Sequence, residues 1–171
     1  MFLQARQSDF ETLVRAYSTE LYRYAYWLVR DRFVAEDLVQ ETFLRAWKGW
    51  SSLKDASATR SWLYTILRRE RARLYEKKSA RLETALDPEA EALLADPALS
   101  WAIEGMDVRQ AMAALPETYR EPLMLQVLGG FDCREIAAML DTTEGAIMTR
   151  VSRARMAFRK LPDWNETNKV A

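Results

Sequence analysis

Residues Phe131 to Lys160 read FDCREIAAMLDTTEGAIMTRVSRARMAFRK and predict two short helices joined by a tight turn. We expect the first helix from about Cys133 to Leu140 and the second from near Glu144. Apolar residues recur in both at helical spacing, so the two helices can pack against each other. The pattern is typical of a helix-turn-helix, which places its second helix in the DNA major groove. An ordinary helical hairpin would give the same pattern.

The second of these helices is rich in polar and basic side chains. They are Thr149, Arg150, Ser152, Arg153, Arg155 and Arg159. The first residues of such a helix reach bases, whereas later ones more often meet phosphate. We therefore expect Thr149 and Arg153 to face bases, and Arg155 and Arg159 to contact phosphate or to pack.

Upstream, apolar periodicity predicts three longer helices, over residues 9–29, 34–48 and 59–78. Ser8 followed by Glu11 predicts a capping box at the start of the first helix. Asp31 stands where it can cap the second. With only 5 Gly and 5 Pro in the chain, the composition also favours helices.

The predicted helix over 34–48 has two different faces. Its apolar stripe, which we expect to join the core, consists of Val39, Phe43, Ala46, Trp47 and Trp50. The other face consists of Asp37, Gln40, Glu41, Leu44 and Lys48. From the pattern alone, that second face is most simply solvated.

The predicted helix over 59–78 combines basic and aromatic residues on one stripe. Its members are Arg60, Tyr64, Arg68, Arg71, Tyr75 and Lys78. Between Arg45 and Arg81 the chain carries 11 basic and 3 acidic residues, a local charge of +8, although 25 basic and 25 acidic residues balance overall. Such a surface suits a nucleic acid, with phosphates near the cations and bases stacked on the rings. A solvated helix with arginine stems lying along it is the alternative.

The local charge becomes negative over residues 82–107, which contain seven acidic residues and no basic one. We interpret them as an acidic linker that can hold one short helix over 89–95. Beyond it, Val108 to Leu115 mark a helix, and Pro116 fits the first turn of the next. Pro122 should kink that helix or delay its start, and Gly129-Gly130 should end it.

The composition excludes several classes of enzyme. The chain has no histidine and one cysteine, Cys133, which removes Ser-His-Asp and Cys-His catalysis as well as the usual zinc sites. It also has no glycine-rich phosphate loop and no calcium loop. We therefore expect no enzyme activity, no cofactor and no metal. An export signal and a membrane span are also missing from the pattern, which indicates the cytoplasm.

Six short motifs occur in a single order along nearly the whole chain. They are Ala35–Phe43 (AEDLVQETF), Trp62–Ile66 (WLYTI), Leu115-Pro116, Tyr119-Arg120, Glu135–Ala137 (EIA) and Thr149–Arg155 (TRVSRAR). Together they resemble the small extracytoplasmic-function, or group 4, sigma factors of bacterial RNA polymerase, in the sigma-70 family.

The resemblance implies an all-α protein of two small helical domains joined by the acidic linker. Residues 1–80 would be sigma region 2, residues 81–105 the linker and residues 106–171 sigma region 4, with its helix-turn-helix. The implied partners are core RNA polymerase (the β′ clamp helices and the β flap), promoter DNA and a cognate anti-sigma factor. Direct insertion into a membrane is not expected.

The resemblance also assigns roles to the surfaces described above. It makes the polar face of 34–48 a polymerase contact: Asp37, Gln40, Glu41, Leu44 and Lys48. It assigns the −10 promoter element to Lys54, Arg60, Trp62, Tyr64, Arg68, Arg71 and Tyr75. It assigns the −35 element to Gln126, Met148, Thr149, Arg150, Ser152, Arg153 and Arg155.

Three positions depart from the family pattern. Arg69 and Arg73 stand where many members have Asn and Asp, and Met148 stands where many have Lys or Arg. Two other classes fit parts of the sequence. A helix-turn-helix repressor or activator would act without polymerase, and a helical adaptor would bind no nucleic acid.

Overall fold

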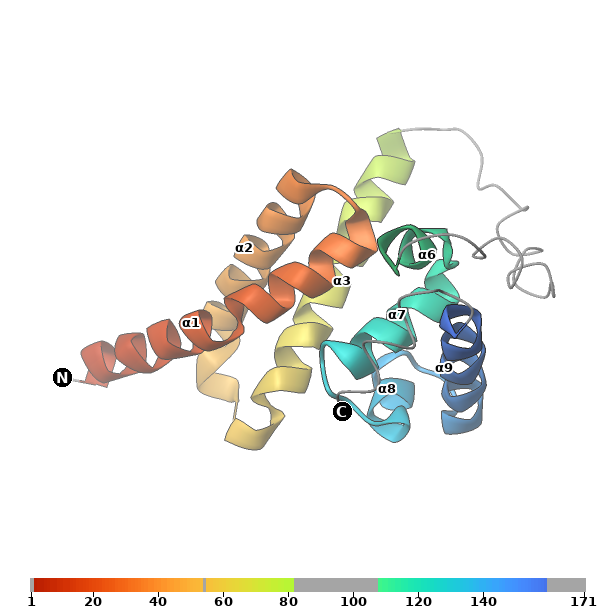
Figure 1. Ribbon diagram of the computed structural model, residues 1–171. Helices are drawn as coiled ribbons and strands as arrows, with labels where there is room; N and C mark the ends of the chain where they lie inside the picture. The colour runs from red at the N-terminus through yellow and green to blue at the C-terminus, as the bar shows by residue number, and fades with distance from the viewer. Residues whose placement is uncertain (1, 54, 82–107, 160–171) are drawn as a thin grey trace. The chain divides into compact units, whose positions relative to one another are not determined.

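The computed structural model describes residues 2–53, 55–81 and 108–159, and every regular element within them is a helix. The all-α prediction is therefore confirmed for this part of the chain. The chain divides into two compact units, Met1–Thr84 and Ala85–Ala171 (Figure 1). Lys54, the acidic linker and its predicted short helix over 89–95 lie outside the described residues.

The first unit is built from three long helices, α1 (Phe2–Val29), α2 (Arg32–Gly49) and α3 (Thr59–Arg81). Two short 3-10 turns, η1 (Trp50–Ser52) and η2 (Ala56–Ala58), connect α2 to α3. Helix α2 packs against both α1 and α3. The fully buried hydrophobic side chains of the unit come from all three helices: Leu21, Tyr24, Ala25, Ala35, Ala46, Leu63, Tyr64 and Leu67.

The beginnings of the first two helices test the predicted caps. Helix α1 already contains Ser8, whose backbone carbonyl accepts a hydrogen bond from the Thr12 hydroxyl at 2.9 Å. The predicted capping box is wrong, because an N-cap residue must lie outside helical geometry. Glu11 instead accepts a bond from the Gln7 amide at 3.1 Å. The predicted cap of α2 is confirmed, since the Asp31 carboxylate accepts from the Val34 amide at 3.0 Å.

Aromatic rings close one end of the first unit. Phe10 of α1 meets the rings of Phe43, Trp47 and Trp50 at centroid distances of 6.4, 5.0 and 5.7 Å. Trp50 also lies 6.4 Å from Trp62 of α3. Edge-to-face pairs of this kind add to the burial of the rings. Most of the predicted apolar stripe of α2 therefore packs inward, although Trp47 remains 37% exposed.

The second unit contains α6 (Val108–Ala114), α7 (Glu117–Val127), α8 (Cys133–Met139) and α9 (Glu144–Phe158). Helix α9 packs against α7 and α8. The predicted contact between the two helices of the 131–160 motif is confirmed by burial. The buried residues are Ile136 and Ala137 on α8, and Ile147, Val151 and Ala154 on α9.

Local caps fix the ends of these short helices. Helix α7 continues through the buried Pro122, so its start is not delayed, and it ends at Val127 before Gly129-Gly130 as predicted. Gly130 has a φ of 65°, which favours glycine. Asp132 and Glu135 form a reciprocal capping box at the start of α8, and the Thr143 hydroxyl caps α9.

Candidate functional site

Helix α2 presents most of the predicted polymerase-contact residues to solvent. Asp37, Gln40, Leu44 and Lys48 are exposed. Leu44 is notable because it is apolar and yet 56% exposed. Glu41 is half-buried, and its carboxylate accepts a bond from the Nε of Arg45 at 3.0 Å. Four of the five predicted residues are therefore available to a partner as they stand.

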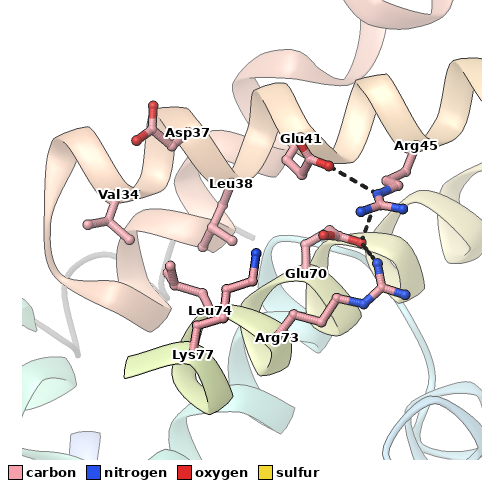
Figure 2. A pocket seen from close by; sticks show the side chains of 9 residues that line it. All are labelled: Val34, Asp37, Leu38, Glu41, Arg45, Glu70, Arg73, Leu74 and Lys77. Carbon is pink, nitrogen blue, oxygen red and sulfur yellow. Dashed lines mark hydrogen bonds and ion pairs between the residues drawn. The ribbon is translucent and has the colours of Figure 1, made fainter. Parts of the chain in front are cut away.

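A groove of about 350 Å³ separates α2 from α3 (Figure 2). Its apolar floor is made by Val34, Leu38 and Leu74. Its charged wall is made by Asp37, Glu41, Arg45, Glu70, Arg73 and Lys77. The three carboxylates and three cations balance, so the groove has no net charge to attract a small ion of either sign.

Glu70 is the most buried of these charged groups, with 8% of its side chain exposed. Its Oε1 lies 2.7 Å from the Nη1 of Arg73 and 3.4 Å from the Nε of Arg45. Arg45 also bonds Glu41, so a continuous row of ion pairs joins α2 to α3 (Figure 2). Arg73, one of the departures from the family pattern, therefore has a partner within its own helix.

Two of the predicted −10 residues, Arg60 and Tyr64, converge on one carboxylate in α1. Glu20 accepts two bonds from Arg60, from its Nε and its Nη2, both at 2.8 Å. It accepts a third from the Tyr64 hydroxyl, also at 2.8 Å. Tyr64 is fully buried, and this burial, helped by the bond to Glu20, raises its pKa far above the usual range. The bond to Glu20 also raises the pKa of Arg60.

The other described −10 candidates lie closer to the surface. Trp62 and Arg68 are half-buried. The Arg71 guanidinium sits 5.0 Å from the centroid of the Tyr75 ring, in cation–π geometry, and Tyr75 is 45% exposed. The pair puts a positive charge over one face of a partly exposed aromatic ring.

The exposed face of α9 carries most of the predicted −35 residues. Met148, Thr149, Ser152 and Arg153 are exposed, and Arg150 is half-buried. The Nη1 of Arg153 lies 3.5 Å from the hydroxyl of Tyr119 on α7. A shallow hollow of about 440 Å³ lies beside these residues, lined by Thr118, Tyr119, Gly145, Ala146, Thr149, Arg150 and Arg153.

Two further −35 candidates are joined to each other across the second unit. The Nη2 of Arg155 on α9 donates to the Oε1 of Gln126 on α7 at 2.8 Å. The amide of Gln126 also lies 3.9 Å from the Sγ of Cys133 on α8. Gln126 thus contacts the two helices that follow its own, and its bond orients Arg155 toward α7.

Sequence reasoning missed Glu20 and Glu70, the carboxylates that organise the first unit. Their arginine partners Arg60 and Arg45 lie 40 and 25 positions away along the chain, and no local pattern pairs residues at such distances. The Asp132 capping box was also missed, although Asp followed three positions later by Glu is a recognisable signal.

Within residues 2–53, 55–81 and 108–159, no group of three or more acidic or cysteine side chains is arranged to hold a metal ion. None of the helices described is long and apolar enough to cross a bilayer.

Comparison with known families agrees with both units. Residues 13–81 match the model of sigma-70 region 2, and residues 105–158 match that of sigma-70 region 4. The fold and its exposed helices are therefore those of a sigma-70-type factor. A relative named as an extracytoplasmic-function RNA polymerase sigma factor is 37% identical to the chain, over 70% of that relative, so the chain belongs to this family.

Individual relatives agree with this family. The chain is 37% identical to the sigma factor EcfG of Rhodopseudomonas palustris over 74% of its length and 70% of the relative. It is 29% identical to SigE of Mycolicibacterium smegmatis over 91% of its length and 62% of the relative.

One solved structure is similar along most of the chain. It is the sigma factor RpoE of Bartonella quintana in complex with the anti-sigma factor NepR. The TM-score is 0.69 at 27% identity, covering 89% of this chain and 95% of that one.

Proposed function

We propose that this chain binds core RNA polymerase and directs it to specific promoters, with no catalytic activity of its own. The observation that carries the proposal is the presence, in one chain, of two exposed helix faces with different chemistry. The α2 face is mixed polar and apolar, which suits a protein partner. The α9 face is polar and basic, which suits DNA. A repressor that acts without polymerase needs only the second.

The two faces lie in different proposed domains, and each domain has its own binding role. Residues 1–80 dock on polymerase and bind the −10 element, residues 81–105 form the linker, and residues 106–171 bind the −35 element. The proposed docking contacts are Asp37, Gln40, Glu41, Leu44 and Lys48, with Leu44 as the apolar contact among polar neighbours. The partner is a helical segment such as the β′ clamp helices, and the β flap contacts the second unit.

Arg60 and Tyr64 serve the −10 element by positioning rather than by direct contact. Their bonds to Glu20 lock α3 against α1. Helix α3 then holds the half-buried Arg71 and the exposed Tyr75 in a fixed orientation. Stacking on such rings tolerates any base and so suits a melted strand.

On α9, we assign Thr149 and Arg153 to base edges. Both are exposed; Thr149 lies in the first half of α9, the part that enters the major groove, and Arg153 follows it by about one turn on the same side. Arg159 follows at the end and is assigned to phosphate. Arg155 and Gln126 hold α9 against α7, so that the base-facing residues keep their orientation.

Control by a cognate anti-sigma factor is part of the proposal. The support is the likeness to Bartonella quintana RpoE, whose structure was solved with NepR bound. Because core polymerase is the partner, the chain works in the cytoplasm, where transcription takes place.

The docking part is tested by reversing one exposed charge on α2. Asp37→Lys should weaken binding of the full chain to core polymerase, because it reverses the charge of an exposed side chain on the proposed contact face. Asp9→Lys, on the exposed side of α1, is the matched control and should bind as the unchanged chain does. Equal affinity of all three proteins for core polymerase would remove the docking assignment.

A further inference from the structure

Phe33, the second residue of α2, is exposed to an unusual degree. Its side chain is 74% accessible, more than any other large apolar side chain in the described residues. It does not cap its helix, because the Asp31 carboxylate supplies the cap through the Val34 amide. Within the described part of the chain, no aromatic ring packs against it. Among the described residues, neither helix capping nor aromatic packing explains a phenylalanine at this position.

Helix geometry places Phe33 on the same stripe as the proposed docking residues. At 3.6 residues per turn, Asp37 lies one turn further along the helix, Gln40 two turns and Leu44 three turns. All three are exposed, so the stripe is continuous. Phe33 and Leu44 are about 16 Å apart along the axis. They form two apolar ends with polar side chains between them.

The stripe also has a direction. Asp37 follows Phe33 by one turn, and Lys48 follows Leu44 by one turn. A partner helix that fits must therefore offer two apolar residues about three turns apart. It must also offer a cation opposite Asp37 and a carboxylate opposite Lys48. Opposite charges in these places favour one alignment of the partner and disfavour the reversed one.

We propose that Phe33 is a second apolar anchor of the polymerase interface, paired with Leu44, and that it extends this interface by one turn toward the N-terminus of α2. The inference rests on the proposed docking of α2. Its support is the continuity of the stripe from Phe33 through Asp37 and Gln40 to Leu44. Aromatic residues, phenylalanine included, are enriched in protein interfaces relative to the rest of the surface.

The test measures the affinity of the full chain for core polymerase after substitutions at Phe33. Phe33→Ser should bind about tenfold more weakly, since truncating an aromatic anchor commonly has an effect of this size. Phe33→Leu should stay within about threefold, because it keeps an apolar side chain of similar reach. Tyr26→Ala, which removes an aromatic that is 38% exposed on α1, is the control and should bind like the unchanged chain.

Thermal melts should show that the Phe33 variants keep the stability of the parent. The inference is overturned if Phe33→Ser binds as tightly as the unchanged chain while Asp37→Lys binds weakly, a result that leaves the docking proposal standing. It is also overturned if Phe33→Ser and Tyr26→Ala weaken binding equally. If Phe33→Ser leaves polymerase binding intact but abolishes self-association of the chain, the stripe binds a second copy instead. Docking itself fails if neither Asp37→Lys nor Phe33→Ser changes the affinity.

Discussion

Arg45 of α2 lies 3.4 Å from Glu70 of α3, and this ion pair joins the proposed docking helix to the proposed −10 helix. Glu70 is buried, and its Oε1 also forms an ion pair with the Nη1 of Arg73 at 2.7 Å. A buried carboxylate is costly unless cations and hydrogen bonds compensate it. The arginine at position 73, where many family members have Asp, therefore has a structural reason in this chain.

We predict that the stability of the fold depends strongly on the two arginines that pair with Glu70. Replacing both Arg45 and Arg73 by Met leaves a buried carboxylate without a cation, and we expect a loss of about 2–3 kcal/mol in the free energy of unfolding. Each single replacement keeps one cation and should cost clearly less than half as much. Urea unfolding of the three variants measures the effect.

The matched control is Arg32→Met, which breaks the exposed pair between Arg32 and Glu36. Exposed pairs of this kind contribute little, so the urea midpoint should barely move. If the losses in the free energy of unfolding of the two single variants at Arg45 and Arg73 add up to the loss of the double variant, the two arginines do not substitute for each other in compensating the charge of Glu70.

Tyr64 predicts a change in the pH dependence of stability. Burial raises the pKa of its hydroxyl in the folded chain above the usual value of 10.0. The resulting stability is fully present below about pH 10 and is lost as the pH rises further, because only the unfolded chain then releases the proton. Tyr64→Phe should therefore lose stability less steeply than the parent above that pH.

At neutral pH the same variant should be less stable, by about 1–2 kcal/mol, because Glu20 loses a hydrogen bond. Urea unfolding between pH 7 and 11 separates the two effects. Parallel curves for parent and variant up to pH 11 would show that Tyr64 ionises as readily in the folded chain as in the unfolded one.

Arg153 and Arg159 should behave differently on promoters. Arg153→Ala should change which −35 base is preferred, since losing an arginine–guanine contact costs about 1–3 kcal/mol at one base pair. Arg159→Ala should weaken all promoters alike and lower the slope of binding against salt by about one. Transcription from promoters with every single-base −35 variant distinguishes them. A uniform loss with Arg153→Ala would mean that the base-facing side of α9 is assigned wrongly.

The bond between Arg155 and Gln126 predicts that the two residues are energetically coupled in stability and that Arg155 does not determine base preference. In a double-mutant cycle, Arg155→Ala and Gln126→Ala should be non-additive by roughly 0.5–1 kcal/mol, because both remove the same contact. The −35 base preference of Arg155→Ala should match that of the parent. Additive losses of stability, or a new base preference, would contradict this role and assign Arg155 to direct contact with the −35 DNA.

Local sequence patterns predicted the helices well. The 131–160 motif, the cap at Asp31 and the glycines after α7 all depend on neighbours within a few positions, and each was found. The capping box at Ser8 failed although its pattern was correct. The helix already begins at Phe2, so that the same residues lie inside it.

The parts that local patterns missed depend on tertiary contacts. Tyr64 lies on a stripe whose sequence pattern is basic and predicted to be exposed, yet it is buried: its ring packs against Tyr24 of α1, and its hydroxyl donates to Glu20. In the sequence Arg155 is one of several cations on α9, but Gln126 from another helix orients it. Periodicity shows which residues share a face, whereas the packing of other helices decides whether that face remains open.

Run-off transcription on a promoter library, with and without the full chain added to core polymerase, tests the proposed function most directly. We expect chain-dependent transcripts from a small set of promoters that share −35 and −10 sequences, and a sharp loss of those transcripts with Asp37→Lys. The proposal would be contradicted if the chain bound specific DNA equally well without polymerase and only reduced transcription from it.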